Sequence, residues 1–142
     1  MHHIAITKKE WHLIEKILSG EKTIESRWYK TKHILWDRIK AGDNIYFKNT
    51  GEPVSIKAKV SKVLQIEVSS EKQKREILAK YQKSLGVKEV MPAIGDYIKG
   101  KRYCLLVFFE NPKKIKPFEI NKKGFGLMSA RITVDNINKV KI

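Results

Sequence analysis

Short β-strand patterns alternate with helical patterns along this chain, and turn-forming residues separate them. The clearest strand pattern runs from Val54 to Val60, where apolar residues alternate with serine and lysine, as in a strand with one buried face. Turn-forming residues at 49–53 precede it, and the apolar phase shifts after Val60, which indicates a bulge or a bend. Further strands are predicted at 4–6, 22–29, 44–48, 103–110, 115–120, 128–134 and 140–142.

Two segments combine helical spacing with helix end signals. Ser70 is placed to cap the longest helix, over 71–85, and Gly86 suits the left-handed position that follows a helix. Thr7 and Glu10 match a capping box, in which the two side chains bind the first free backbone amides of a helix. This pattern predicts a second helix directly after the first strand.

The remaining segments have weaker signals. A short helix is expected at 31–40, and 87–101 reads as a loop with at most a helical turn. Asn111-Pro112 is expected to end the strand that begins near 103, because proline cannot donate to a strand ladder. The order of strands and helices predicts one α+β domain over 1–142, folded as a mixed β-barrel with flanking helices.

Charge gives the first indication of a partner. The chain has 30 lysine and arginine residues against 15 acidic residues, which gives a formal net charge of +15. Such an excess favours polyanions, because cationic contacts release the counterions condensed on phosphates. Most of these residues are lysines, which also suit a surface that is simply soluble. Charge alone therefore does not show whether the domain binds RNA, a nucleotide or no specific ligand.

The sequence also indicates a cellular location and several features that we do not expect to find. Its single cysteine, Cys104, lies in an apolar run and reads as a buried thiol, so no disulfide is expected. No stretch has the ~20 apolar residues of a membrane span, and Met1 leads directly into a strand, so we expect no signal peptide, no membrane association and a cytoplasmic location. His12 and His33 lack ligand spacing, and no metal or other cofactor is expected. The oligomeric state is left open.

One motif carries the functional argument. Residues 20–27 follow the pattern G-x-K-x-x-E-x-R at the junction between the first helix and a strand. On a strand, Glu25 and Arg27 share a face and lie about 6.5–7 Å apart. They form either an ordinary surface ion pair or a site in which Arg27 binds a phosphate or a base edge while Glu25 orients it. Lys22, at the turn into the strand, has a flexible stem that reaches the same space.

This motif, followed by a turn at Gly42-Asp43 and a strand over Ile45-Tyr46-Phe47, resembles ASCH domains, which are related in fold to PUA domains. The resemblance is strongest over 4–68. It implies a PUA-like β-barrel whose cleft is lined by the motif and binds RNA. Some relatives are hydrolases, including a branch similar to N4-acetylcytidine amidohydrolases, in which a threonine three residues after the motif lysine is the nucleophile. Glu25 occupies that place here, which counts against the amidohydrolase activity.

Other residues are expected to complete the cleft. Tyr29 shares the face of Glu25 and Arg27 and is expected to stack on a base, whereas Trp28 is expected to face the core. The polar loop after 47 is either a phosphate contact or only a hairpin turn. Ser129 and Arg131, on a late strand, would lie opposite Glu25 and Arg27 if the barrel closes there. The expected nucleic-acid-binding residues are Lys22, Glu25, Arg27, Tyr29, Lys48, Asn49, Ser129 and Arg131.

The sequence thus favours an RNA- or nucleotide-binding domain linked to RNA metabolism or translation regulation. The alternative is a small hydrolase acting on RNA or on a modified nucleoside, with Glu25 as general base and Lys22 stabilising negative charge in the transition state. A third hypothesis is a protein-interaction adaptor whose basicity is incidental. Whether the 71–85 helix gates the cleft stays open.

Overall fold

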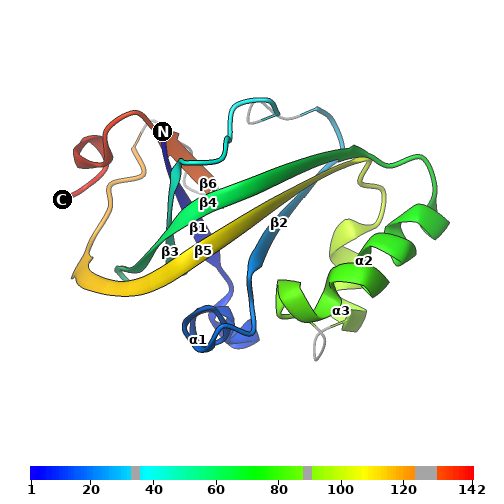
Figure 1. The fold of residues 1–142 in the computed structure, drawn as a ribbon, viewed down its shortest axis with the longest axis horizontal. Helices are drawn as coiled ribbons and strands as arrows, with labels where there is room; N and C mark the ends of the chain where they lie inside the picture. The colour runs from blue at the N-terminus through cyan, green and yellow to red at the C-terminus, as the bar shows by residue number, and fades with distance from the viewer. Residues whose placement is uncertain (33–35, 88–90, 124–130) are drawn as a thin grey trace.

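A curled, mixed β-sheet forms the framework of the protein (Figure 1). The computed structural model describes residues 1–32, 36–87, 91–123 and 131–142. The strand order is β2-β5-β4-β3-β1-β6, in which β1 runs parallel to β3 and every other neighbouring pair is antiparallel. The strands are β1 (His2–Thr7), β2 (Ile24–Tyr29), β3 (Asn44–Asn49), β4 (Val54–Glu67), β5 (Tyr103–Phe118) and β6 (Arg131–Val134).

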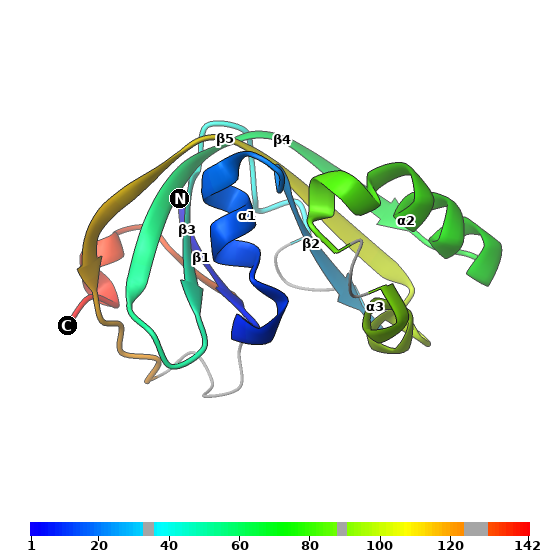
Figure 2. The same ribbon diagram turned by 90° about the horizontal axis from the view of Figure 1, so that it is seen from below.

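In the described part of the chain, three α-helices accompany the sheet. Helix α1 (Leu13–Ser19) lies inside its curl, whereas α2 (Glu71–Leu85) and α3 (Met91–Ile98) lie beside the far ends of β2, β4 and β5 (Figure 2). Short 3₁₀ helices cover Lys9–Trp11 and Ile137–Lys139. The sheet is a half-barrel rather than a flat layer, and the predicted α+β mixed barrel with flanking helices is confirmed in this form.

Apolar residues cover both faces of β5, because the strand separates two cores. Cys104 and Leu106 pack with residues of α2 and α3 on one face. Leu105 and Val107 pack on the other face with Ile17 of α1. The unbroken apolar run is therefore confirmed as a strand buried on both faces, and Cys104 is fully buried.

Local signals predicted α2 and the β4 irregularity correctly. Ser70 Oγ accepts a hydrogen bond of 3.1 Å from the backbone N–H of Gln73, and Gly86 follows the helix with φ of 71°. The register of β4 against β5 shifts between Val60 and Lys62, at the predicted bulge. In the described ranges, no helix is long and apolar enough to span a membrane.

The predicted capping box at Thr7 is wrong. Thr7 is the last residue of β1, and its hydroxyl donates to Asn49 Oδ1 at 2.8 Å instead of capping a helix. A 3₁₀ turn follows, and His12, with φ of 55°, separates it from α1. A bond to the neighbouring strand therefore outweighs the local capping pattern.

The predicted strand end at Asn111-Pro112 is also wrong. Strand β5 continues to Phe118 through a bulge, because Lys59 pairs with Glu110 whereas Lys57 pairs with Lys113. The extra residue on β5 falls between Glu110 and Lys113, where Asn111 has φ of 54°. A bulge is one of the places where a strand tolerates proline.

Two segments read with weaker signals also differ from expectation. The 87–101 region contains α3, which is longer than the expected turn. In the 31–40 region, residues 33–35 lie outside the described part of the chain. Residues 36–38 form a turn instead of the predicted helix, and Asp37 has φ of 67°, which a helix does not allow.

Candidate functional site

Lys22 is a buried cation held by backbone carbonyls. Its side chain is 3% exposed, and its Nζ donates to the carbonyls of Ile24 at 2.6 Å and Leu85 at 2.7 Å. The chain reaches this place because Gly20, with φ of 86°, ends α1 and turns toward β2. Gly86 leaves room for the lysine, since a Cβ there would lie 3.2 Å from the Lys22 Cβ. Lys22 is thus fixed in the protein and is not a flexible surface group.

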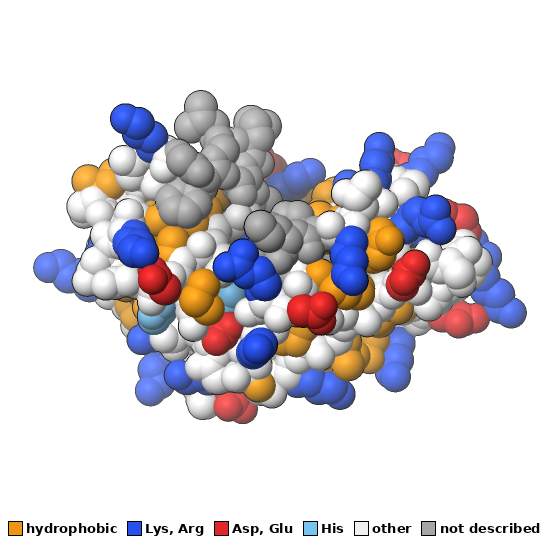
Figure 3. Space-filling model, turned by 90° about the horizontal axis from the view of Figure 1, so that it is seen from above, with side chains coloured by type: hydrophobic (Ala, Val, Ile, Leu, Met, Phe, Trp, Pro, Cys, Tyr) orange, Lys and Arg blue, Asp and Glu red, His pale blue; other side chains and the backbone are white. Residues whose placement is uncertain are grey.

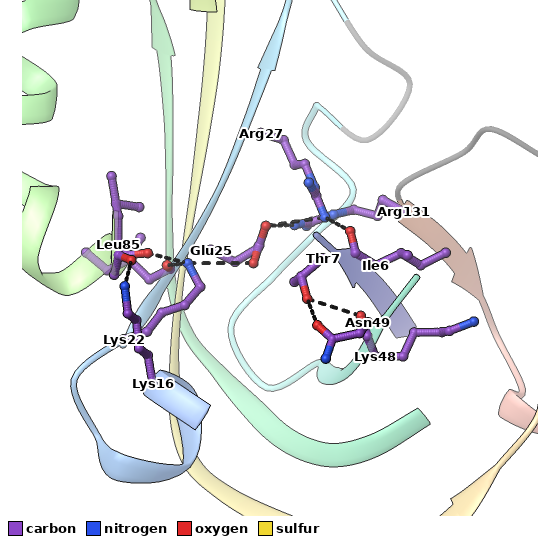
Figure 4. A network of polar contacts seen from close by, with 12 residues as sticks. Ile6, Thr7, Lys16, Lys22, Glu25, Arg27, Lys48, Asn49, Leu85 and Arg131 are labelled. Carbon is purple, nitrogen blue, oxygen red and sulfur yellow. Dashed lines mark hydrogen bonds and ion pairs between the residues drawn. The ribbon is translucent and has the colours of Figure 1, made fainter. Parts of the chain in front are cut away.

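Glu25 lies at the centre of a buried group of charges. Its Oε2 is 3.8 Å from Lys22 Nζ, and its Oε1 is 3.3 Å from Arg27 Nη2 and 3.8 Å from Arg131 Nη2. Figure 4 shows Glu25 between the lysine on one side and the two guanidinium groups on the other. We call Lys22, Glu25, Arg27 and Arg131 the Glu25 cluster.

Cations outnumber carboxylates in the Glu25 cluster, and the ionisation of each group reflects this. Burial alone would raise the pKa of Glu25, but Arg27, Lys22 and Arg131 together hold it below its usual value. Burial lowers the pKa of Lys22 to about 8, with the two arginines adding to the effect and Glu25 opposing it. Burial and the neighbouring Arg27 lower the pKa of Arg131 to about 10.

The cluster opens into a cavity of about 350 Å³, within the size range of small-molecule sites. Its floor contains the buried residues Lys22, Glu25 and Trp28, and its apolar sides include Val87 and Ile94. The more exposed lining residues, which we call the rim, are Lys8, Trp11, Thr50, Tyr97 and Lys122.

Rim side chains contact neighbouring residues. Lys8 Nζ lies 4.8 Å from the centre of the Trp11 ring, and the Tyr97 side chain hydrogen-bonds with Arg27. The cavity therefore combines a cationic floor with aromatic groups nearer the solvent.

Comparison with known proteins gives one kind of match. The sequence matches no protein-family model and no curated protein. The solved ASCH structure of Zymomonas mobilis is similar, with a TM-score of 0.68 and 17% identity over 97% of this chain and 90% of that one. Two structures of mutants of that protein give TM-scores of 0.66 at 18% identity, over 94% of this chain and 89% and 87% of theirs. This chain has the fold of an ASCH domain.

Within this ASCH fold, four predicted site residues come together. Lys22, Glu25 and Arg27 line the cavity, and Arg131 joins them from β6, as expected if the barrel closes there. Tyr29 is half-buried and is not among the described lining residues. Ser129 lies outside the described residues.

The polar residues at the end of β3 make contacts within the protein. Asn49 Oδ1 accepts the hydroxyl of Thr7, and its Nδ2 donates to Glu52 at 2.8 Å, so both ends of the amide are used within the protein. Lys48 is 8% exposed, and in Figure 4 its amine points away from Glu25. These contacts join the β3–β4 turn to the end of β1, where Thr7 and Thr50 line the cavity.

Sequence reasoning missed the aromatic rim. Trp11 belongs to the 3₁₀ turn, packs against the core beside α2 and α3, and is half-buried at the cavity. Tyr97 lies in α3, within a segment that the sequence pattern predicted to be a loop. Trp28, by contrast, is 2% exposed and packs with α2 and α3, as expected of a core residue. The signal available for Trp11 was its place three residues after Lys8, shortly after the end of a strand.

Proposed function

We propose that the cavity binds one nucleotide unit of RNA or a free nucleotide, and that the domain serves RNA metabolism or translation regulation. The observation that carries this proposal is the Glu25 cluster, which places three cations and one carboxylate beside a cavity of about 350 Å³. Arginine guanidinium groups match phosphate oxygens in geometry and charge, and Glu25 orients both guanidinium groups.

The rim and the surface charge support the same proposal. Trp11 and Tyr97 offer aromatic faces near the mouth, where base stacking is worth about 1–3 kcal/mol per base. Lysine and arginine side chains are spread over the face in Figure 3 rather than gathered in one patch. This distributed charge attracts polyanions from a distance, whereas the cavity supplies the specific contacts.

The test compares RNA binding by the wild type, Arg27→Ala and Arg75→Ala. Arg75 is an exposed residue of α2, so it controls for the loss of one positive charge. Fluorescence anisotropy with short single-stranded and structured RNAs, and competition by mononucleotides, would be measured over a salt series. We expect Arg27→Ala to weaken binding about tenfold or more, in protein shown by circular dichroism to be folded, and Arg75→Ala to have a small effect. Equal weakening by the two variants would contradict a specific site.

Hydrolysis is the second candidate function, favoured by the lowered pKa of Lys22 beside a buried carboxylate at the cavity floor. Strongly shifted ionisable groups gather at catalytic sites. In this alternative, Glu25 is the general base and Lys22 stabilises negative charge in the transition state. The lowered pKa of Glu25 makes it a weak base, which is why binding is the first proposal. Thr23 is exposed and does not line the cavity, so it does not replace a threonine nucleophile.

Turnover decides between the two candidates. RNA and modified nucleosides would be incubated with the wild type and with Glu25→Gln and analysed for products by mass spectrometry. Hydrolysis requires products from the wild type that disappear in Glu25→Gln while binding persists. If the substrates remain intact even at high protein concentration, hydrolysis is contradicted and binding remains the proposed function.

A further inference from the structure

The two oxygens of the Glu25 carboxylate differ in what they contact. Oε1 lies nearest the guanidinium groups, whereas Oε2 lies on the other side, 3.8 Å from Lys22 Nζ (Figure 4). That distance is too long for a hydrogen bond, and Oε2 accepts none from the residues that the structure describes. A buried carboxylate oxygen without a donor costs free energy, so a ligand that donates a hydrogen bond there would stabilise the site.

Lys22 Nζ supplies the complementary group beside this oxygen. The lysine has a pKa of about 8, so at neutral pH it is mostly an ammonium with three N–H donors. Two of the donors bind the carbonyls of Ile24 and Leu85, and within the described ranges Nζ makes no third hydrogen bond. A donor and an acceptor thus lie side by side at the cavity floor. A group that accepts at one atom and donates from the next atom would bind both.

Apolar side chains enclose this end of the cavity. Leu13 lies close to Lys22, because a Cβ at Gly86 would lie 3.5 Å from Leu13 Cδ2 and 3.2 Å from Lys22 Cβ. Val87 directly follows Gly86, and Ile94 is a further buried residue of the cavity lining. A flat ring with a polar edge suits such a place, since its faces contact apolar side chains while its edge reaches the polar pair.

We propose that Lys22 and Glu25 bind the Watson–Crick edge of one unpaired base, with an acceptor of the base on Lys22 Nζ and the adjacent N–H donor on Glu25 Oε2. This inference rests on the proposed nucleotide-binding function and adds which part of the nucleotide enters the cavity. Proteins that take up a single unpaired base commonly bind it through this edge and through contacts to its faces. Because pairing occupies the same edge, a base within an RNA duplex should not bind here.

The first test deletes single groups from the base and uses only the wild-type protein. Calorimetry would compare adenosine 5′-monophosphate with the same nucleotide lacking the amino group and with its 1-deaza form, which lacks the adjacent acceptor. The 7-deaza form, whose Watson–Crick edge is intact, is the control. We expect either deletion at the edge to weaken binding about tenfold and the control to bind like the parent.

The corresponding cytidine nucleotides, without the amino group or with a 3-deaza ring, extend this test to pyrimidines. Ribose 5-phosphate, which has no base, should bind much more weakly than either parent nucleotide. Equal affinity of parent and edge-deleted forms in every series that binds would overturn the inference. Ribose 5-phosphate that binds as tightly as the nucleotides would overturn it as well.

The second test assigns the acceptor of the base to Lys22. Lys22→Met removes the donor, so this variant should bind adenosine 5′-monophosphate and its 1-deaza form equally. Lys16→Met is the matched control, because Lys16 also donates to a carbonyl at the end of α2, that of Gly86 at 2.7 Å, but is not among the described lining residues. The control should keep the preference for the parent nucleotide. The same preference in folded Lys22→Met would contradict the inference, and if that variant does not fold, the wild-type comparison still decides.

The outcomes separate this inference from the function on which it rests. Nucleotide or RNA binding that depends on Arg27 but ignores the edge of the base would keep the proposed function and overturn the inference. Failure of every nucleotide and RNA to bind the folded wild type would contradict the proposed function itself.

Discussion

The Arg131 guanidinium lies 3.8 Å from the Glu25 carboxylate, although β6 and β2 are the two opposite edges of the sheet. Both side chains are almost fully buried, at 3% and 4% exposure. Arg27 of β2 reaches the same region, where its Nη2 donates to the carbonyl of Ile6 in β1 at 3.4 Å. Charged side chains therefore link the two ends of the curl at the cavity.

Replacing Glu25 should destabilise the fold strongly. Glu25→Gln leaves three buried cations without their carboxylate, and the loss of one partner from a buried ionic group typically costs about 3–5 kcal/mol. Urea unfolding monitored by tryptophan fluorescence would measure the loss, with exposed Glu21→Gln as the control. A cost no larger than that of the control would mean that water or another group already compensates the cations.

Lys22 should make stability rise with pH above about 8. Its pKa is about 8 in the folded protein and 10.5 in the unfolded chain, so between these values the unfolded chain binds more protons. The free energy of unfolding then increases with pH, by up to about 1.4 kcal/mol per pH unit from this one group. The measurement is urea unfolding between about pH 7.5 and pH 9.5 for wild type and Lys22→Met. The variant should lack this increase, and an unchanged slope would place the pKa of Lys22 elsewhere.

His3 should produce a loss of stability in mild acid. It is fully buried, with its ring nitrogens 2.8 Å from Asp43 Oδ2 and from Thr133 Oγ1. Burial lowers the pKa of His3 below 6.5, despite the opposing bond to Asp43. The unfolded chain therefore binds the proton more readily, so stability present above about pH 6.5 decreases as the pH falls below it.

Thermal unfolding from about pH 7.5 to pH 5 would measure this effect of His3. The exposed residue His12, changed to asparagine because asparagine tolerates its positive φ, provides the control. The His3→Gln variant should lose the His3 contribution to the pH dependence, whereas His12→Asn should keep it. If both variants match the wild type, other groups cause the acid sensitivity.

The bulge in β5 predicts an unusual order of substitutions at Asn111. Its φ of 54° costs about 1–2 kcal/mol for a residue with an ordinary side chain, less for asparagine and nothing for glycine. Asn111→Ala should therefore destabilise by about 1 kcal/mol, and Asn111→Gly by less. Chemical unfolding of both variants, beside the exposed neighbour Lys113→Ala, gives the comparison. A larger loss with glycine would argue against the left-handed conformation.

The sequence allowed the local parts of this fold to be predicted. Helix α2 has its expected bounds because Ser70 and Gly86 act on the backbone beside them. The motif identified three residues that line the cavity, because strand periodicity places Glu25 and Arg27 on one face. Helix α3 was not predicted, because its proline and glycine obscure the helical pattern of its apolar residues. Its packing against β2, β4 and β5 is a tertiary contact, which the sequence pattern does not report.

Long-range bonds account for what could not be predicted. Lys22 read as a flexible turn lysine, yet it is fixed by the carbonyl of Leu85, 63 residues later. Thr7 matched a capping box, but its hydroxyl donates a hydrogen bond to the side-chain oxygen of Asn49, 42 residues away. A sequence pattern does not report partners at such distances, so burial of these polar groups became visible only in the folded arrangement.

The link between Glu25 and Arg131 has a consequence for how the two edges of the sheet can move. A backbone ladder separates cooperatively, whereas a single ion pair can break alone. Between the described parts of β2 and β6, the contact that we observe is of the second kind. The two edges can therefore separate at this point while every strand keeps its neighbours. Salt in the solution should weaken the link only slightly, because both side chains are almost fully buried.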